Sequence, residues 1–311
     1  MKYVPVVVTF NRCDLLKKSL DSLLNQTVKP QKIVIIDNAS TDDTEKVVQN
    51  YLNNSDLFHY VKLSENIGGS GGFSRGVKEA MKFHPDWVAL SDDDSEYEKN
   101  YFETINKERK NYPNVKVFTG TVVHKGTNSI ETYQRGMLLR MSTLKGADSK
   151  LDQYKHNFYF NFFTFVGVVI NADLIQKYGY PKDNYFIWSD DIEYSLRLGQ
   201  HTKILNLVNT HIYHNDDYQF NDLSKVKPGL QWKEFYGVRN TADIMVNYNG
   251  KSLAWIVALY RLAHKSMRVF FKKELGGVPL KGYRWQSFKM ITRATFDGLN
   301  GKLGKDKIYK P

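Results

Sequence analysis

Two clusters of carboxylates combine residue type and spacing in a way that can do chemistry. The first is the run Asp92, Asp93 and Asp94, which follows the apolar stretch "WVAL". Adjacent carboxylates repel one another unless a cation or hydrogen bonds offset their charge. In an extended chain Asp92 and Asp94 point the same way, and such oxygen ligands suit Mg²⁺ or Mn²⁺. We therefore expect a divalent-cation site here, the alternative being a solvated acidic turn.

The second cluster lies in "YFIWSDDIEYSLRLG", residues 185 to 199, where Asp190, Asp191 and Glu193 open a predicted helix. The helix dipole stabilises an acid at such a position, so capping alone is the alternative interpretation. A carboxylate there can serve as a general base if its pKa suits the proton that it removes. Trp188 precedes the acids and offers an aromatic wall on which a sugar ring can stack.

Two histidines follow a further short strand in "NTHIYHND", namely His211 and His214. Most isolated histidines are ordinary surface or core residues. A histidine just after a strand, however, can complete a metal site that aspartates begin. Spacing alone leaves both interpretations open for His214.

The stretch "SENIGGSGGFSRGV", residues 64 to 77, places four glycines within five positions. The preceding "FHYVKL" alternates like a short strand, and apolar residues recur at helical spacing from Phe73 to Phe83. A strand, a glycine loop and a helix start commonly hold a negatively charged or phosphorylated ligand. We expect a loop that forms the wall of a ligand pocket, with the helix beginning near Phe73.

The elements that would position these residues alternate between strands and helices. Strands are expected at 3–10, 31–38 and 86–94, and helices at 13–27 and 40–52. This order predicts an α/β fold whose mostly parallel sheet is covered on both faces and binds ligands at its carboxyl ends. Polar residues collect at those ends, and they are Thr9, Asn11, Arg12, Asp37, Asn38 and the three aspartates Asp92 to Asp94.

Composition favours a folded intracellular protein with a distinct C-terminal part. The 311 residues are 41% hydrophobic and include one cysteine, which excludes an internal disulfide framework. We see neither a secretory signal nor a membrane-spanning run. Residues 251–311 hold 14 basic and 3 acidic residues, while the other 250 residues hold 30 of each. We expect a domain at 1–225 and a basic, mainly helical region at 226–311.

The basic region contains a predicted helix from Ser252 to Lys273. Its cations form one stripe, and its apolar residues lie roughly opposite. An amphipathic basic helix can lie on an anionic membrane surface. The alternative is an ordinary helix that packs on the first domain or on a second subunit. The stripe is Arg261, Lys265, Arg268 and Lys272, and the opposite residues are Ile256, Leu259, Ala263 and Phe270.

Five motifs in fixed order, "VVVTFNR", "IVIIDNASTDDT", "ENIGGSGGFSRG", "LSDDD" and "WSDDIEYSLR", resemble the family 2 inverting glycosyltransferases with a GT-A fold. The resemblance covers residues 3 to 215, and the glycine-rich motif looks most like galactofuranosyltransferases and their rhamnosyltransferase relatives. It implies a nucleotide-diphosphate-sugar donor, Mn²⁺ or Mg²⁺, and inversion at the anomeric carbon. It also implies a glycan or lipid-linked saccharide acceptor and a peripheral location at the cytoplasmic face of the cell membrane.

Residue roles follow from the same resemblance. On the donor side, Thr9 and Asp37 would contact the nucleoside, Asp92 would lie near the ribose, and Arg75 would approach the diphosphate or sugar. The remaining residues assigned to the donor pocket are Asn11, Arg12, Asn38, Asn66, Gly68, Gly69 and Asp93.

Three further positions match the chemistry of that family. Asp94 and His214 would ligate the metal, and Asp191 would deprotonate the acceptor hydroxyl with Asp190 beside it. The family's Glu-Asp pair reads Asp190-Asp191 here, so the assignment between these neighbours stays open.

Several alternatives remain at this point. The preferred donor is UDP-galactofuranose, with dTDP-rhamnose second. A protein of another class, which would bind nucleic acid through the basic region, is disfavoured because no recognition motif accompanies the charge. A homo-oligomer contact is another use of the same region.

Overall fold

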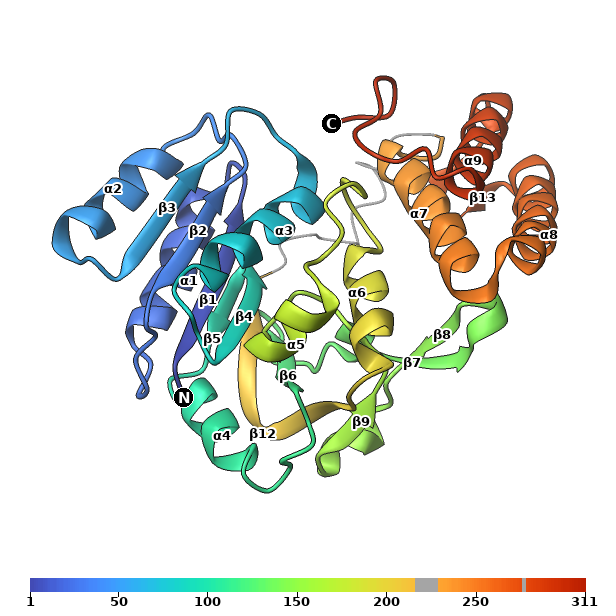
Figure 1. Cartoon of the computed structure of the whole chain (residues 1–311). Coiled ribbons are helices and arrows are strands. Elements are labelled where there is room, and N and C mark those ends of the chain that lie inside the picture. Colours follow the sequence, from blue (N-terminus) through green and yellow to red (C-terminus); the bar gives the residue numbers. More distant parts are fainter. Residues whose placement is uncertain (216–228, 276–277) are drawn as a thin grey trace. The chain divides into compact units, whose positions relative to one another are not determined.

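The computed structural model describes residues 1–215, 229–275 and 278–311 (Figure 1). The chain divides into two compact units. The sheet unit comprises residues 1–138, 146–183 and 191–216, and the helical unit comprises residues 139–145, 184–190 and 217–311. The expected boundary between residues 225 and 226 lies outside the described residues.

Four parallel strands begin the sheet unit. They are β1 (Tyr3–Thr9), β2 (Ile33–Asp37), β3 (Phe58–Lys62) and β4 (Trp87–Asp92), in the spatial order β3-β2-β1-β4. The helices α1 (Cys13–Leu24), α2 (Thr44–Asn54) and α3 (Gly68–Met81) connect them. These strands and the first two helices agree with the sequence prediction.

The sheet continues beyond β4 with mixed directions, in the order β4-β11-β6-β12-β5, and β9 also pairs with β12. β11 (Val168–Asn171) is antiparallel to both neighbours, whereas β12 (Ile204–His214) is parallel to β6 (Val117–His124). β5 (Ser95–Tyr97) and β9 (Phe158–Phe160) are antiparallel to β12. A separate sheet has the order β10-β7-β8, with bounds Phe162–Phe163, Arg135–Arg140 and Lys145–Asp148.

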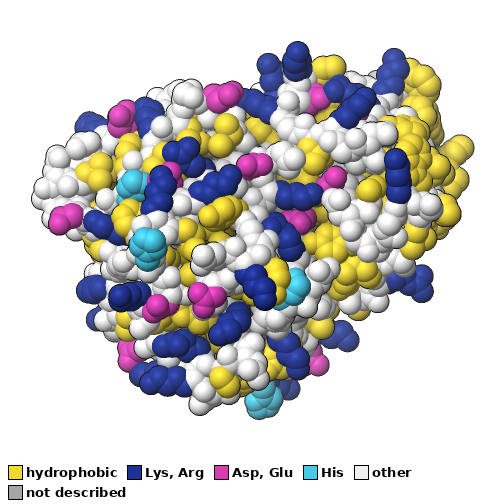
Figure 2. All heavy atoms as spheres, viewed as in Figure 1, with side chains coloured by type: hydrophobic (Ala, Val, Ile, Leu, Met, Phe, Trp, Pro, Cys, Tyr) yellow, Lys and Arg dark blue, Asp and Glu magenta, His cyan; other side chains and the backbone are white. Residues whose placement is uncertain are grey.

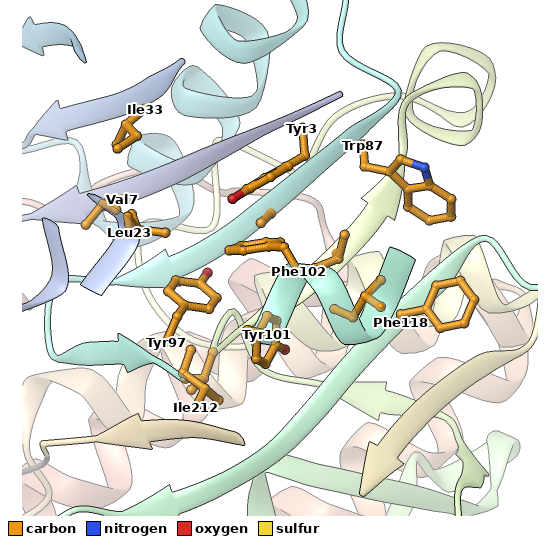
Figure 3. Close-up of a cluster of buried hydrophobic side chains, with 14 of the residues drawn as sticks. Tyr3, Val7, Leu23, Ile33, Trp87, Tyr97, Tyr101, Phe102, Phe118 and Ile212 are labelled. Atoms are coloured by element: carbon orange, nitrogen blue, oxygen red, sulfur yellow. The ribbon is translucent and has the colours of Figure 1, made fainter. Parts of the chain in front are cut away.

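Helices cover both faces of the large sheet, as predicted. One hydrophobic core packs α1, α2 and α4 (Tyr101–Glu108) against one face, and Figure 3 shows its aromatic centre around Tyr3, Tyr101 and Phe102. The other core packs α3, α5 (Ala172–Tyr178) and α6 (Asp190–Gly199) against the opposite face. Short 3₁₀ turns lie at Thr132–Gln134, Met141–Thr143 and Leu151–Lys155.

The glycine-rich stretch is helix rather than loop, which corrects the prediction. α3 begins at Gly68, and the only left-handed glycine of the stretch is that first residue, with φ of 80°. A Cβ on Gly72 would lie 2.7 Å from Val8 Cγ1, and one on Gly76 would lie 2.2 Å from Val6 Cγ1. The glycines at these two positions therefore allow α3 to approach β1 closely.

The helical unit is built mainly from α7 (Trp232–Asn249), α8 (Lys251–Phe271) and α9 (Arg284–Leu299). α7 and α9 share a core around Phe235, Tyr236 and Met290, and a second cluster joins α7 to α8 through Ala254 and Ala258. β13 (Glu274–Leu275) and β14 (Val278–Pro279) form a short pair. Across the described ranges, we find no helix with the length and apolar character that a membrane span requires.

Candidate functional site

The polar ends of β1, β2 and β4 lie side by side because these strands pair in parallel. Thr9 is opposite Asp37, and Asp92 is opposite Val8. Polar groups expected at three separate places in the sequence thus share one edge of the sheet. This is the edge at which open α/β sheets bind ligands.

Asp93 and Asp94, which directly follow β4, contact Thr9 at the end of β1 and Arg12 just beyond it. Thr9 Oγ1 donates to Asp93 Oδ2 at 2.6 Å, and the Arg12 guanidinium lies 3.3 Å from Asp93 Oδ1 and 2.8 Å from Asp94 Oδ2. Burial raises the pKa of Asp93 to about 6 even though Arg12 lowers it. Burial and the two neighbouring carboxylates raise the pKa of Asp92 well above its ordinary value. Arg12 is therefore the local counter-charge for a buried acidic group.

His214, the last residue of β12, lies between two carboxylates. Its Nδ1 is 2.9 Å from Glu131 Oε2, and its Nε2 is 3.4 Å from Asp94 Oδ1. The antiparallel pairing of β12 with β5 places His214 opposite Ser95, the residue after Asp94. Burial alone would lower the pKa of His214, but the two adjacent carboxylates of Asp94 and Glu131 outweigh it and raise the pKa to about 10.

The pair formed by Asp94 and His214 fits a hard divalent cation. Asp94 Oδ1 is buried and has no hydrogen-bond partner within residues 1–215, 229–275 and 278–311, although His214 Nε2 lies 3.4 Å from it. Two ligand atoms that each lie about 2.1 Å from one ion, at roughly right angles, are about 3 Å apart. The observed 3.4 Å separation is close to that value.

The described residues do not supply a complete set of metal ligands around Asp94 and His214. Across residues 1–215, 229–275 and 278–311, no group of three or more His, Cys, Asp or Glu side chains converges as a ligand set. Mg²⁺ typically keeps several waters and binds substrate phosphates alongside one or two carboxylates. Two protein ligands are therefore consistent with an ion that also binds a phosphorylated substrate.

The end of β2 is held by local hydrogen bonds. Asp37 is fully buried, and its carboxylate accepts from Ser40 N at 2.7 Å and from the Tyr60 hydroxyl at 2.6 Å. Burial and the bond to Asp37 raise the pKa of Tyr60 above its ordinary value, so this hydroxyl remains a donor. Asn11, which has a φ of 54°, donates its backbone N–H to Ser40 Oγ at 3.0 Å.

Asn38 and Asn66 shape the start of α3. Asn38 Nδ2 donates to Gly68 O at 2.9 Å, and its Oδ1 accepts from Ile67 N at 3.0 Å. Asn66 Oδ1 accepts from Gly68 N at 2.8 Å. A Cβ placed on Gly69 would meet no atom within 4 Å, so this position borders open space. The expected pocket-lining residues 66, 68 and 69 thus lie beside Asn38, where β2 ends.

Arg75 is engaged elsewhere. Its Nε donates to Glu79 Oε1 at 2.9 Å, and the buried Glu79 also contacts Lys82 and His59. Burial opposes ionisation of Glu79, but its hydrogen bonds to Lys82 and His59 and the positive charges of Lys82 and Arg75 lower the pKa of its carboxyl. Among the described contacts, Arg75 belongs to this ion-pair cluster and not to the aspartates after β4.

Asp191 lies in the first turn of α6. Its Oδ1 accepts from Ile192 N at 2.7 Å, and burial raises the pKa of its carboxyl to about 6. A carboxylate with a pKa near 6 is a better proton acceptor than an ordinary surface aspartate. Asp190 is buried, and the boundary between the two units falls between these neighbours.

The segment before Asp190 belongs to the helical unit and has an unusual backbone. Phe186, Trp188 and Ser189 all have positive φ, between 65° and 70°. Such conformations persist only where surrounding structure holds them. Asn240 of α7 does so here, because its Nδ2 donates to the carbonyls of Tyr185, Ile187 and Trp188 at 3.1, 3.1 and 2.8 Å. Trp188 remains 44% exposed.

Sequence reasoning missed Glu131 and Asn240. Glu131 lies 83 positions from His214, and no spacing rule links the two. Asn240 is an uncharged side chain in the middle of an 18-residue helix and is fully buried. A polar residue on the apolar face of a predicted helix was the one available signal for it, since buried polar groups require partners.

Comparison with known proteins gives one family and several relatives. The model of the family described as "Glycosyl transferase family 2" matches residues 6–172. The chain is 36% identical over 89 residues to "Galactofuranosyltransferase GlfT1" of Mycolicibacterium smegmatis, a match that covers 29% of this chain and 28% of that protein. It is 29% identical over 156 residues to "GalNAc(5)-diNAcBac-PP-undecaprenol beta-1,3-glucosyltransferase" of Campylobacter jejuni, which covers 50% of this chain and 49% of that protein.

These matches span between about a quarter and a half of the curated relatives' own length. Among solved structures, "GalNAc-T7 with UDP, GalNAc and Mn2+" superposes with a TM-score of 0.63 at 15% identity, and it covers 94% of this chain and 55% of that one. This likeness confirms the predicted fold class.

Proposed function

This chain belongs to glycosyl transferase family 2, and from that premise we propose that it is a metal-dependent, inverting enzyme. It transfers a sugar from a nucleotide-diphosphate donor to a hydroxyl of a glycan or lipid-linked acceptor. The observation that carries this proposal is the pair of Asp94 Oδ1 and His214 Nε2, which lie 3.4 Å apart. Asp94 Oδ1 is buried and has no hydrogen-bond partner among the residues that the structure describes. The pair lies at the sheet edge where phosphorylated ligands bind.

Asp94 and His214 would hold Mn²⁺ or Mg²⁺. Such an ion, when bound, offsets the negative charge that develops on a departing diphosphate. Glu131 accepts the Nδ1 hydrogen of His214, which leaves Nε2 directed toward Asp94. Arg12 compensates the remaining acidic charge, so that a phosphorylated donor can approach Asp93 and Asp94.

The nucleoside end of the donor is assigned to the ends of β1 and β2. Thr9, Asp37 and Asp92 would contact the base and ribose, while Asn11, Asn38, Asn66, Gly68 and Gly69 would line the pocket. The open space at Gly69 supports this placement. Arg75 would have to leave Glu79 before it could reach a diphosphate, so we assign it the weakest share of donor binding.

Asp191 is the proposed general base. Inversion requires one base that deprotonates the acceptor hydroxyl and no covalent enzyme intermediate. A carboxyl with a pKa of about 6 is largely deprotonated at neutral pH and still accepts a proton readily. Asp190 is its neighbour in the motif, and the exposed ring of Trp188 offers a surface for a sugar of the acceptor.

The proposed donor is UDP-galactofuranose, with dTDP-rhamnose as the second choice. The name of the mycobacterial relative supports the first, and the UDP and Mn²⁺ named with the solved neighbour support a uridine nucleotide and a cation. The undecaprenol diphosphate in the name of the Campylobacter relative supports a lipid-linked acceptor. We infer a peripheral location at the cytoplasmic face of the membrane, with residues 226–311 as the region that reaches it.

Thermal-shift measurements test the proposal. UDP and dTDP are each added with and without Mn²⁺ to the wild type, to Asp94→Asn and to Asp152→Asn, an exposed control acid. A ligand at 100 times its Kd stabilises the native state by about 2.7 kcal/mol. We expect UDP with Mn²⁺ to raise Tm in the wild type and in the control but not in Asp94→Asn.

Three other results of the thermal-shift experiment would change or contradict the proposal. A larger rise in Tm with dTDP than with UDP would favour dTDP-rhamnose as the donor. Equal responses in Asp94→Asn and the wild type would exclude Asp94 as a metal ligand. The absence of any response to either nucleotide contradicts the donor site as a whole.

A further inference from the structure

Helix α8 turns its apolar residues outward. Ile256, Tyr260, Met267 and Phe271 are 66%, 70%, 55% and 85% exposed. We call the exposed apolar residues of this helix the apolar stripe. They are Leu253, Ile256, Leu259, Tyr260, Met267, Phe270 and Phe271. Figure 2 shows hydrophobic side chains gathered along the edge of the helical unit where α8 lies in Figure 1.

The cations of α8 face the other way, into a cavity. This cavity has a volume of about 360 Å³ and lies among α7, α8 and α9. Its charged and titratable lining consists of Arg261, His264, Lys265 and Arg268 from α8 and Glu234 from α7. We call it the basic cavity. Volumes of about 300 to 1,000 Å³ are typical of sites for small ligands.

The cations of the basic cavity are only partly neutralised. Lys265 Nζ lies 2.9 Å from Glu234 Oε2, and the Arg261 guanidinium donates to the carbonyl of Thr143. The Nε of Arg268 is buried and has no hydrogen-bond partner in the described part of the chain. An unsatisfied buried donor is costly, and arginine forms strong paired hydrogen bonds with phosphate. An anion in the cavity would satisfy it.

The cavity opens beside the apolar stripe. Tyr260 and His264 both line it and are both exposed, so they mark its mouth. Tyr260 is also a member of the stripe. A ligand that fits this arrangement has a negatively charged head and an apolar body directly next to it.

We propose that the basic cavity binds the phosphate of a membrane lipid while the apolar stripe lies in the membrane interface. An interfacial helix typically buries its apolar face about 5–10 Å into the boundary between head groups and acyl chains. This orientation is the reverse of one in which the basic stripe itself rests on the lipid surface. The choice of a lipid as the source of the phosphate rests on the membrane location inferred under the proposed function.

Vesicle flotation tests the proposal with the full chain. The vesicles contain phosphatidylcholine alone or phosphatidylcholine mixed with phosphatidylglycerol, and no sugar nucleotide is present. Arg268→Gln removes the guanidinium whose Nε has no hydrogen-bond partner among the described residues. Lys272→Gln removes an exposed charge directly after α8 that does not line the cavity. Ile256→Gln alters the stripe, and Ile308→Gln is its control because Ile308 is 70% exposed on another segment.

We expect the wild type to float with the mixed vesicles. A charged hydrogen bond contributes about 1.5–3 kcal/mol, so Arg268→Gln should weaken binding about tenfold or more. Loss of a general surface charge costs about 1 kcal/mol, so Lys272→Gln should weaken it by less than about fivefold. Ile256→Gln should reduce binding to both kinds of vesicle, and Ile308→Gln should not.

Three results would overturn the proposal. The first is a wild type that stays with the soluble fraction, whether as a monomer or as a dimer joined through α8. The second is an equal loss in Arg268→Gln and Lys272→Gln, which would indicate unspecific surface charge. The third is a rise in Tm with inorganic phosphate or diphosphate that needs Arg268 while vesicles do not bind, which would indicate a soluble anion.

Failure of this inference is distinguishable from failure of the proposed function. The response of Tm to UDP and Mn²⁺ is measured without vesicles and should be the same in Arg268→Gln and the wild type. A protein that binds UDP but not vesicles retains its donor site and loses only the lipid site. Equal Tm values of Arg268→Gln and the wild type without ligand show that the variant is folded.

Discussion

Leu16, Leu20 and Leu23 of α1 are fully buried against the sheet, whereas Ile256 and Phe271 of α8 are 66% and 85% exposed. Both helices repeat apolar residues at helical spacing. In the sheet unit the apolar side chains of α1 are buried in a core, because the helix packs on a large apolar surface of β-strands. In the helical unit the buried residues of α8 are only Ala254, Ala258 and Val269. Periodicity therefore defines a helix, but the neighbouring surface decides which face is buried.

Charges differ between the units in the same way. In the sheet unit, Arg12 pairs with Asp93 and Asp94, and Glu79 pairs with Arg75 and Lys82. In the helical unit, Arg261, Lys265 and Arg268 of α8 line a cavity. Glu234 is the acidic residue of that lining. These acids of the sheet unit thus have cationic partners, whereas the Nε of Arg268 has no hydrogen-bond partner in the described part of the chain.

The largest effect is expected where the sheet unit carries chemistry. Asp191→Asn keeps the shape of the side chain but removes its basicity, and general bases contribute about 10²- to 10⁴-fold to rate. We expect turnover to fall by that factor while the Tm response to UDP with Mn²⁺ stays unchanged. Turnover is measured as UDP release with an acceptor. A variant with wild-type turnover would remove Asp191 from the chemistry.

The next effect compares the loss of stability on truncating an apolar residue in α1 and in α8. Leu20→Ala deletes methyl groups from a filled core and should lower the free energy of unfolding by about 2–5 kcal/mol. Ile256→Ala changes an exposed position and should stay within about 0.5 kcal/mol of the wild type. Urea unfolding measures both. A large loss in Ile256→Ala would mean that the apolar stripe is already covered in solution.

A smaller effect concerns the support of His214. Glu131→Gln keeps a hydrogen-bond acceptor but removes the charge beside Nδ1, and loss of such outer partners typically costs about 10- to 100-fold in metal affinity. We expect the Mn²⁺ concentration needed for the UDP-induced rise in Tm to increase by that factor. Gln134→Ala, which removes another partner of Glu131, serves as the milder comparison. An unchanged Mn²⁺ requirement would assign Glu131 a purely structural role.

The smallest effect is a change with pH. Burial raises the pKa of Asp191 to about 6, and a general base works only when it is deprotonated. The value of kcat/KM should therefore be flat above pH 6 and fall up to tenfold per pH unit below it. The profile is measured from pH 5 to 8, and the residual activity of Asp191→Asn should lack this limb. A midpoint near pH 4 would indicate an unburied carboxylate.

Much of the sheet unit was predictable because its signals are local. The β-branched strands at the start of the chain, the leucines of α1 and the polar residues after each strand lie close together in the sequence. Parallel pairing then brings Thr9, Asp37 and Asp92 to one edge, as the predicted topology requires. The roles of these residues stay predictions until the binding and turnover experiments are done.

Other features depended on partners far away in the sequence. The glycines after Asn66 were expected to form a loop, yet Val6 and Val8 of β1 make them the packing surface of a helix. Glu131 reaches His214 across 83 positions, and Asn240 holds backbone carbonyls more than 50 positions away. The periodicity of a short segment cannot predict contacts between residues that are far apart in the sequence.

The sequence by itself determined the order of strands and helices over residues 3–94, the polar strand ends there and the amphipathic character of α8. These follow from the repeat of side chains along the backbone, which is a property of a short segment. Only the tertiary structure decided that the cations of α8 face inward and its apolar residues face outward. That choice depends on which surfaces α7 and α9 offer to α8, and burial is a property of the assembled chain.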